Sequence, residues 1–188
     1  MFSLYNDILN IVKEVLQSQD YFYIGIDGDA GAGKSTLAKD LAKVLDADII
    51  AMDDFFLPLE KRSAERLNMP GGNIDYERFI EEIYDHRWDK SFKHCRYDCH
   101  LGKMTAYKEI IKKAVIIIEG SYALHPKFRD LYDLNIYMQV SEELQKSRIK
   151  DRNPEDYDHF INQWIPMEKA YFAATKPLEI SDISILTE

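Results

Sequence analysis

The chain has few cysteines, no excess of positive charge and no long apolar run. Its 33 acidic residues outnumber its 24 basic ones and give a formal net charge of −9, which argues against a nucleic-acid partner because general nucleic-acid binders present a basic face. No apolar run approaches the ~18 residues of a membrane span, and no signal-peptide pattern opens the chain, so we expect no membrane partner. The two cysteines indicate a reducing, cytoplasmic setting rather than a disulfide scaffold.

Internal repeats, low-complexity tracts and linkers are also missing from the 188 residues. This length lies within the range of roughly 50–250 residues that is typical of one domain. An apolar content of 46% supplies enough side chains for a core. We therefore expect residues 1–188 to form a single domain.

One short segment carries the strongest functional signal, because it matches the pattern GxxxxGK[ST] without a mismatch. It consists of Gly28, Asp29, Ala30, Gly31, Ala32, Gly33, Lys34, Ser35 and Thr36. An apolar strand pattern precedes it and a helical pattern follows it, which is the context that a phosphate-binding P-loop requires. The glycines let backbone N–H groups wrap a phosphate, Lys34 can reach the β- and γ-phosphates, and the Ser35 hydroxyl can ligate Mg²⁺. We expect this segment to bind ATP with Mg²⁺.

Apolar patterns along the rest of the chain alternate between strand and helix. Strands are expected at 21–26, 48–52, 114–118, 134–140 and 180–186, and helices at 4–16, 37–45, 76–84, from Ser141 onward, and at 155–174 with a bend or break at Pro166. Segment 58–73 is typical of a long loop or lid, and 91–109 of a small hairpin. These patterns predict an α/β fold: a P-loop NTPase three-layer sandwich with a central parallel sheet of about five strands and a substrate-side insertion at about 54–110.

Three acidic residues follow predicted strands, where ligands bind in parallel sheets. Asp53 and Asp54 come after the second strand, and Glu119 comes after the strand at 114–118. Phosphoryl transfer needs oxygen ligands for Mg²⁺ and a carboxylate that accepts a proton, and either purpose suits these positions. Because neighbouring side chains at a strand end point in opposite directions, only one of Asp53 and Asp54 is expected to face the γ-phosphate.

Several ordered segments together resemble one enzyme family. GIDGDAGAGKST, MDDFFLP, GGNIDYERF, YDCH, VIIIEGSYALHP and WIPMEKAYF are similar to the uridine kinase-like branch of the P-loop kinases, which includes phosphoribulokinases, and especially to its short bacterial members. The resemblance extends from about Tyr21 to the end of the chain. It implies an ATP-dependent kinase that phosphorylates a hydroxyl of a small molecule, most simply a nucleoside such as uridine.

The resemblance also implies roles for individual residues. Asp53 falls on the base that deprotonates the sugar hydroxyl, and Glu119 on the acid that helps to hold Mg²⁺ together with Ser35. Asp75 falls on the acid that binds the ribose, although capping of the helix at Tyr76 is an equally good interpretation. Arg148 and Arg152 match, more loosely, the arginines that grip the phosphates beside a lid at 148–154.

The acceptor side departs from the family pattern. Tyr97 and His100 lie in the segment that reads the base but do not match residue by residue. Phe56 replaces a tyrosine, and the loss of a hydroxyl can change discrimination between acceptors. The runner-up acceptors are therefore a nucleoside such as nicotinamide riboside, or a pantothenate- or sugar-like alcohol.

Two further clusters of residues each allow two interpretations. His94, Cys95, Cys99 and His100 have zinc-like spacing, but no second pair is present, so ordinary pocket or core roles are favoured. Lys61, Arg62 and Arg66 predict a solvated loop face, with binding of an anionic acceptor as the second interpretation. For the whole chain, the alternative to a kinase is a nucleotide-dependent regulatory ATPase without an acceptor, and the sequence leaves homo-oligomer formation open. No Asn-Lys-x-Asp motif of a GTP switch occurs.

Overall fold

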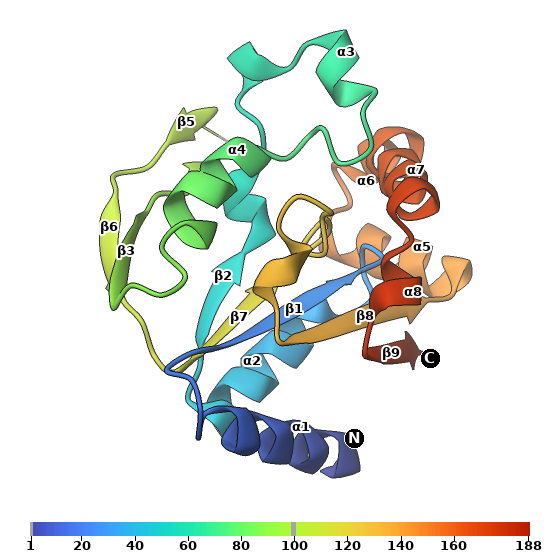
Figure 1. The fold of residues 1–188 in the computed structure, drawn as a ribbon. Coiled ribbons are helices and arrows are strands. Elements are labelled where there is room, and N and C mark those ends of the chain that lie inside the picture. The colour runs from blue at the N-terminus through green and yellow to red at the C-terminus, as the bar shows by residue number, and fades with distance from the viewer. Residues whose placement is uncertain (1, 99–100) are drawn as a thin grey trace.

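A parallel sheet forms the centre of the described part of the chain, which is residues 2–98 and 101–188 of a computed structural model (Figure 1). In this part the sheet has five strands in the order β2-β7-β1-β8-β9, and each neighbouring pair is parallel. The strands are β1 (Phe22–Gly28), β2 (Asp48–Ala51), β7 (Val115–Glu119), β8 (Leu134–Val140) and β9 (Ile183–Thr187). The predicted α/β class and the sheet of about five strands are confirmed.

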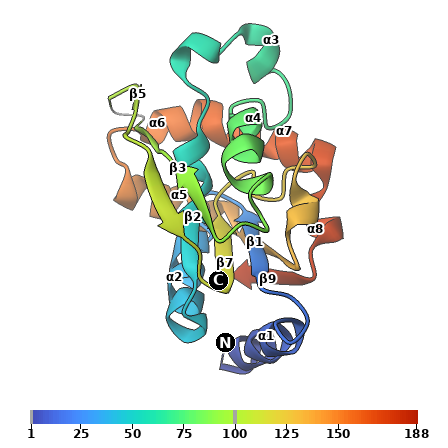
Figure 2. The same cartoon turned by 60° about the vertical axis from the view of Figure 1, so that its left-hand side comes forward.

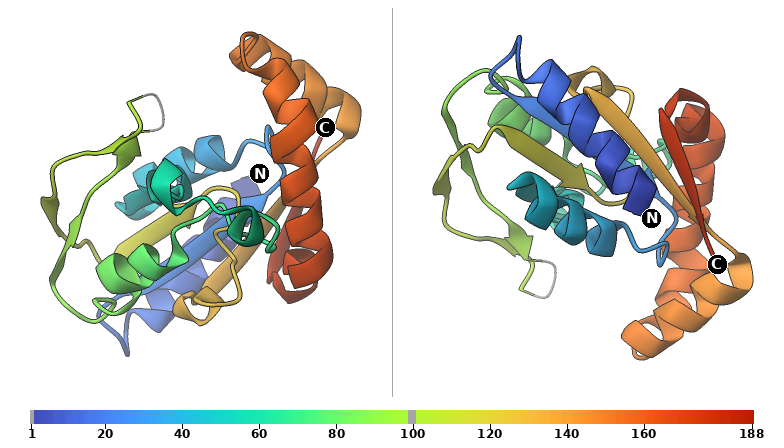
Figure 3. Two further views of the ribbon diagram at one scale, coloured as in Figure 1. Left: turned by 90° about the horizontal axis from the view of Figure 1, so that it is seen from above. Right: turned by 90° about the horizontal axis from the view of Figure 1, so that it is seen from below.

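Apolar side chains on alternating sides of the strands produce two buried layers. On one face, Ile24 and Ile117 pack against α1 (Phe2–Val15) and α2 (Lys34–Leu45). On the other face, Tyr23 and Ile116 pack against the segments at 76–83 and 122–132 and against Tyr171. In Figure 3, α1 lies in front of the sheet in the view from below and behind it in the view from above. The sheet is therefore covered on both faces, as a parallel sheet requires.

The connection from β2 to β7 holds the predicted insertion. Its elements are η1 (Met52–Phe55), η2 (Leu59–Lys61), α3 (Ala64–Leu67), α4 (Tyr76–Phe79), the π-helical turn η3 (Ile80–Tyr84), β3 (Ser91–His94), β4 (Tyr97–Asp98), β5 (Lys103–Met104) and β6 (Lys108–Ile111). β3 pairs with β6 and β4 with β5, both antiparallel, so the predicted hairpin is confirmed. Figure 2 brings this hairpin forward, beside α4. The loop predicted at 58–73 contains two short helical turns.

The C-terminal part begins with α5 (Glu142–Arg152), whose first turn is capped by Ser141 as predicted. α6 (Tyr157–His159) then continues through the π-helical turn η5 (Phe160–Trp164) into α7 (Ile165–Thr175), followed by α8 (Pro177–Ile180) and β9. Pro166 lies in the first turn of α7, immediately after η5. Proline has no backbone N–H for the regular i→i−4 hydrogen bond, and the π turn just before it departs from that bonding pattern. The expected irregularity is therefore present at this place. In the described residues, we find no helix with the length and apolar character that crossing a membrane would need.

Candidate active site

The P-loop joins β1 to α2 through a backbone that only glycine adopts readily. Gly28, Gly31 and Gly33 have φ angles of 140°, 78° and 95°. A Cβ on Gly28 would lie 1.9 Å from the carbonyl oxygen of Met138, so this position has no room for a side chain. Among the described residues, no side chain caps α2 at Gly33. The first N–H groups of α2 therefore remain available to a phosphate, and this cradle fits a nucleotide.

Lys34 extends from the start of α2 across this cradle. Its side chain is largely buried, and Nζ donates to the carbonyl oxygens of Gly28 at 2.6 Å and Asp29 at 2.9 Å. Nζ also lies 3.4 Å from Oγ of Ser121. One helical position further on, the Ser35 hydroxyl donates to Oε2 of Glu119 at 3.0 Å. The structure thus brings together the ammonium group and the two oxygen donors that the sequence singled out, and a hydroxyl beside a carboxylate suits Mg²⁺.

The carboxylates of Asp53 and Glu119 both lie within the electrostatic influence of Lys34. Burial raises the pKa of Glu119, the bond from Ser35 opposes this shift, and the negative charge of Asp53 adds to it. Asp53 is accessible to solvent, yet the protein around its carboxylate desolvates it and raises its pKa, against the positive charges of Lys34 and Arg152. Asp53, Glu119 and Lys34 therefore interact electrostatically at one end of the sheet.

Asp54 has different partners from its neighbour. Its Oδ2 lies 3.1 Å from Nε2 of His94 on β3, and its carbonyl oxygen accepts a hydrogen bond from Arg78. The expected divergence of Asp53 and Asp54 is present, but its predicted cause is wrong. β2 ends at Ala51, and both acids lie in the 3₁₀ turn η1, where successive side chains point about 120° apart because each turn holds 3.0 residues.

The two arginines proposed to bind phosphates lie on α5 beside the P-loop. Arg148 Nη1 donates to the carbonyl oxygen of Gly31 at 2.9 Å. Arg152 Nε donates to Oδ1 of Asn153 at 2.8 Å, and its charge partly opposes the rise in the pKa of Asp53 that burial causes. Arg148 is thus fixed to the P-loop itself, whereas the guanidinium of Arg152 bonds the neighbouring Asn153 and lies over the ring of Phe160.

The residues expected to contact the acceptor are more scattered. Asp75 caps α4 by accepting from the N–H of Arg78 at 3.2 Å, and it pairs with Lys61 Nζ at 2.8 Å. Only 1% of Asp75 is exposed, so the capping interpretation describes this structure. Phe56 is half-buried in a bridge to Ile74, and Tyr97 is buried on β4. His100 and Cys99 lie outside the described residues.

The prediction of a solvated basic face at residues 61–66 is wrong for Arg66. Its guanidinium donates to both carboxylate oxygens of Glu77 at 2.7 Å, to Tyr76 Oη at 2.7 Å and to the carbonyl oxygens of Gly72 and Ile74. These bonds tie the loop to α4. The reason is that the loop folds back over α4, so the Arg66 guanidinium finds acceptors within the protein.

The zinc-like cluster is used for hydrogen bonding where the structure describes it. His94 Nδ1 lies 3.0 Å from Oε2 of Glu82, and the N–H of Cys95 donates to the same carboxylate at 3.4 Å. No group of three or more His, Cys, Asp or Glu side chains in residues 2–98 and 101–188 is arranged to hold a metal ion. In this region His94 and Cys95 belong to a buried polar network.

Sequence reasoning missed two buried carboxylates, Asp27 and Glu168. Asp27 is fully buried and accepts from the N–H groups of Gly28, Tyr122 and Leu124 and from the Tyr171 hydroxyl, at 2.7–3.0 Å. These bonds hold Tyr122 in a left-handed conformation with φ of 74°. An aspartate inside an apolar strand next to the P-loop was the available signal. Glu168 gave no such signal, because it reads as an ordinary helical residue.

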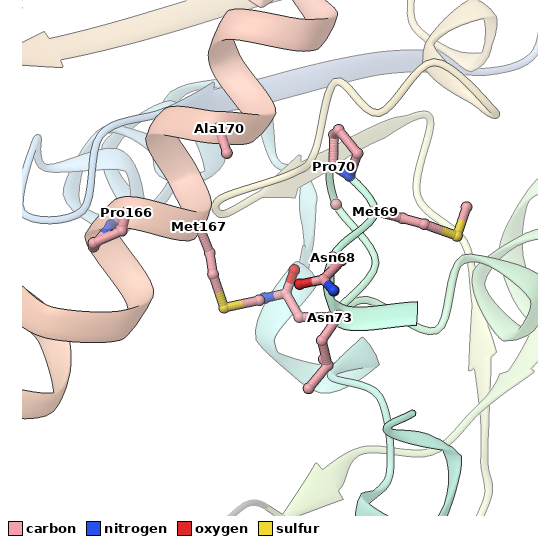
Figure 4. Close-up of a pocket in the computed structure, with 9 residues that line it drawn as sticks. Asn68, Met69, Pro70, Asn73, Pro166, Met167 and Ala170 are labelled. Carbon is pink, nitrogen blue, oxygen red and sulfur yellow. The ribbon is translucent and has the colours of Figure 1, made fainter. Parts of the chain in front are cut away.

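A cavity of about 240 Å³ separates α7 from the loop before α4. Figure 4 shows Pro166, Met167 and Ala170 on the α7 side and Asn68, Met69, Pro70 and Asn73 on the loop side. Most of the lining is apolar. The cavity borders the helix that carries Glu168.

Comparisons with known proteins agree with this geometry. A family model described as AAA domain matches residues 24–165. The uridine kinase of Clostridium tetani is 28% identical over 172 residues, covering 81% of each chain. Among solved structures, a possible uridine kinase from Bacillus stearothermophilus has a TM-score of 0.70 at 20% identity, covering 97% of this chain and 99% of that one. The phosphoribulokinase of Rhodobacter spheroides has a TM-score of 0.61 at 12% identity, covering 90% and 71%. The two structures support the fold.

Proposed function

The chain is a member of the AAA domain family, and from this premise we propose that it is an ATP-dependent kinase that transfers the γ-phosphoryl group to a hydroxyl of a nucleoside such as uridine. One observation carries the proposal. In a complete P-loop the Ser35 hydroxyl donates to Glu119, and the charge of Lys34 acts on both Glu119 and Asp53. The uridine kinase of Clostridium tetani, which matches along most of its length, supports the choice of a nucleoside.

Each residue has a part in this proposal. Backbone N–H groups of the P-loop and Lys34 bind the phosphates, and Arg148 and Arg152 offset the charge that develops on the transferred group. Ser35 and Glu119 would hold Mg²⁺, which when bound neutralises phosphate charge. Asp53 accepts the proton of the attacking hydroxyl, and its raised pKa favours this role at neutral pH.

The acceptor is proposed to lie between η1, α4 and the hairpin. Phe56, Tyr97 and His100 would line this side, and Asp75 would bind a sugar hydroxyl. Because Lys61 covers Asp75 in this structure, acceptor binding requires Lys61 to move away. The composition, with two cysteines, supports a cytoplasmic location.

A coupled assay of ADP release with Mg-ATP tests the proposal over a panel of nucleosides, vitamins and sugars. We expect release that depends on the acceptor, is strongest with a nucleoside and is lost in Lys34→Ala. Release driven by a pantothenate- or sugar-like alcohol would move the activity to the runner-up acceptors. Release that no acceptor changes would instead identify a regulatory ATPase.

A further inference from the structure

One N–H group of the P-loop is bonded to a carboxylate of the protein itself. Glu168 on α7 is 6% exposed, and its Oε2 accepts from the N–H of Ala30 at 3.1 Å. Its Oε1 accepts from the Ser121 hydroxyl. P-loop N–H groups ordinarily face the phosphates of a nucleotide. A negative side chain therefore lies against the place where phosphate is expected.

The segment that Glu168 contacts is held from a second side. The carbonyl oxygen of Ala30 accepts from Gln145 Nε2 at 3.0 Å, and that of Gly31 accepts from Arg148 at 2.9 Å. α7 is fixed as well, because Tyr171 donates to the buried Asp27. The carboxylate and the loop are thus anchored, and a bound phosphate would stay close to Glu168 rather than displace it.

The charges around Glu168 do not compensate a second anion. Lys34 on α2 is the nearby cation and is linked to Glu168 through Ser121, while Asp27 on β1 adds another buried negative charge. Tyr122, after β7, and Tyr137 on β8 also face this group. Burial raises the pKa of Glu168, and Lys34 opposes the shift. Phosphate near this carboxylate further disfavours its charged form, because like charges do so.

We propose that Glu168 is an internal anion of the phosphate site, and that nucleotide binds preferentially when this carboxyl carries a proton. The proton comes from solvent and adds to a carboxylate oxygen. The Ser121 hydroxyl can both donate and accept, so it can turn to accept from the protonated carboxyl. This role rests on the proposed function only in requiring that the chain binds a nucleotide.

The test measures the dissociation constant of Mg-ADP by titration calorimetry from about pH 6 to about pH 9. ADP avoids turnover, and Glu168→Gln removes the charge while its amide can still serve both Ala30 and Ser121. We expect wild-type affinity to weaken as pH rises, by up to about tenfold per pH unit. Glu168→Gln should bind more tightly at high pH and lack this part of the dependence. Glu179→Gln, in an exposed pair with Lys176, should follow the wild type.

Other outcomes of these measurements would contradict the proposal. A Glu168→Gln variant that binds no more tightly, or keeps the wild-type dependence on pH, would show that Glu168 only ties α7 to the loop. A second measurement needs no variant: the binding enthalpy of wild-type protein at one pH in buffers with different ionisation enthalpies. We expect net proton uptake, and its absence would overturn the proposal. Wild-type protein that binds no ADP would contradict the proposed function too.

Discussion

The phosphate side of the site is built from backbone groups, whereas the hairpin side is built from charged side chains. On the phosphate side, positive φ angles and uncapped N–H groups lie within one short stretch from Gly28 to Ser35. On the hairpin side, Asp54 meets Arg78, 24 residues away, and His94, 40 residues away. Glu82 joins Arg78 and His94 in the same buried network.

This difference distinguishes phosphate binding, a property common to many proteins, from the more specific contacts of the hairpin side. A backbone cradle binds phosphate mainly through N–H groups that almost any residue supplies, which explains why this part matches a common motif. The hairpin network sets two acids, Asp54 and Glu82, against two basic groups, Arg78 and His94, and the two acids raise the pKa of His94. Under the proposed function, acceptor choice depends on these side chains, which can change while the phosphate site stays the same.

Replacing Lys34 by alanine should have the largest effect, because it removes the ammonium group from the cradle. We expect phosphoryl transfer to fall to background in a kinetic assay with the best acceptor. Lys43→Ala, on the exposed side of the same helix, is the matched control and should behave as wild type. Near wild-type transfer by Lys34→Ala would show that the P-loop lysine is dispensable here.

Substitutions of the adjacent acids Asp53 and Asp54 test which carboxylate acts as the base, where the phosphate side meets the hairpin side. Removal of a positioned base costs about 10²–10⁴-fold in rate, so Asp53→Asn should lower kcat within that range with little change in ATP affinity. Asp54→Asn removes the negative charge beside His94 and should have the milder effect. Steady-state kinetics of the two variants decide the matter. Greater damage from Asp54→Asn would reverse the assignment of the base.

His94 tests whether charge balance holds the hairpin side. Burial alone would lower the pKa of His94, but its bonds to Asp54 and Glu82 raise it above 6.5. Because the folded state holds this proton more tightly, the resulting stability is fully present below pH 6.5 and is lost as pH rises through the folded pKa.

Denaturant titrations over this pH range should show that decline in the wild type and not in His94→Gln. Below pH 6.5 the variant should be less stable by about 1–3 kcal/mol, because it disturbs a buried hydrogen-bonded network. Lys93→Gln, its exposed neighbour, is the control. A wild-type stability that does not fall with rising pH, or an equal fall in His94→Gln, would remove His94 from the charge balance.

His125 should show the opposite dependence of stability on pH. It is buried among Tyr76, Phe128 and Tyr171, and burial, with the charges of Lys127 and Arg66, lowers its pKa to about 4. Its protonation therefore favours the unfolded chain, and stability falls as pH drops from about 6.5 towards about 4. An NMR titration, assigned with His125→Gln, should place its midpoint near 4 in the folded chain. A midpoint near that of the urea-unfolded chain would contradict this.

The same contrast explains what the sequence could predict. The P-loop, the strands and the contact of Ser35 with Glu119 follow from local patterns, because parallel strands bring their carboxyl ends to one edge. The helix cap at Asp75 was also foreseen. The 3₁₀ turn at Asp53 and Asp54 was not, because its geometry depends on how η1 packs against the hairpin.

Hydrogen bonds between residues far apart in the sequence account for most of the features that the sequence did not predict. Glu168 reaches Ala30 across 138 residues, and Tyr171 reaches Asp27 across 144. No periodicity in one sequence shows which buried acid will meet which distant donor. Arg66 was assigned to solvent for a more local reason: its acceptors lie only 6–11 residues away, but they become neighbours only when the loop folds back over α4.

Phosphorus NMR of wild-type protein with Mg-ATP and uridine tests the central claim most directly, because it shows where the γ-phosphoryl group goes. The proposed kinase activity predicts a new phosphomonoester signal that grows in step with ADP, is absent without uridine, and is greatly slowed in Asp53→Asn. Accumulation of inorganic phosphate in step with ADP, without a phosphomonoester for uridine or any other alcohol of the panel, would contradict it.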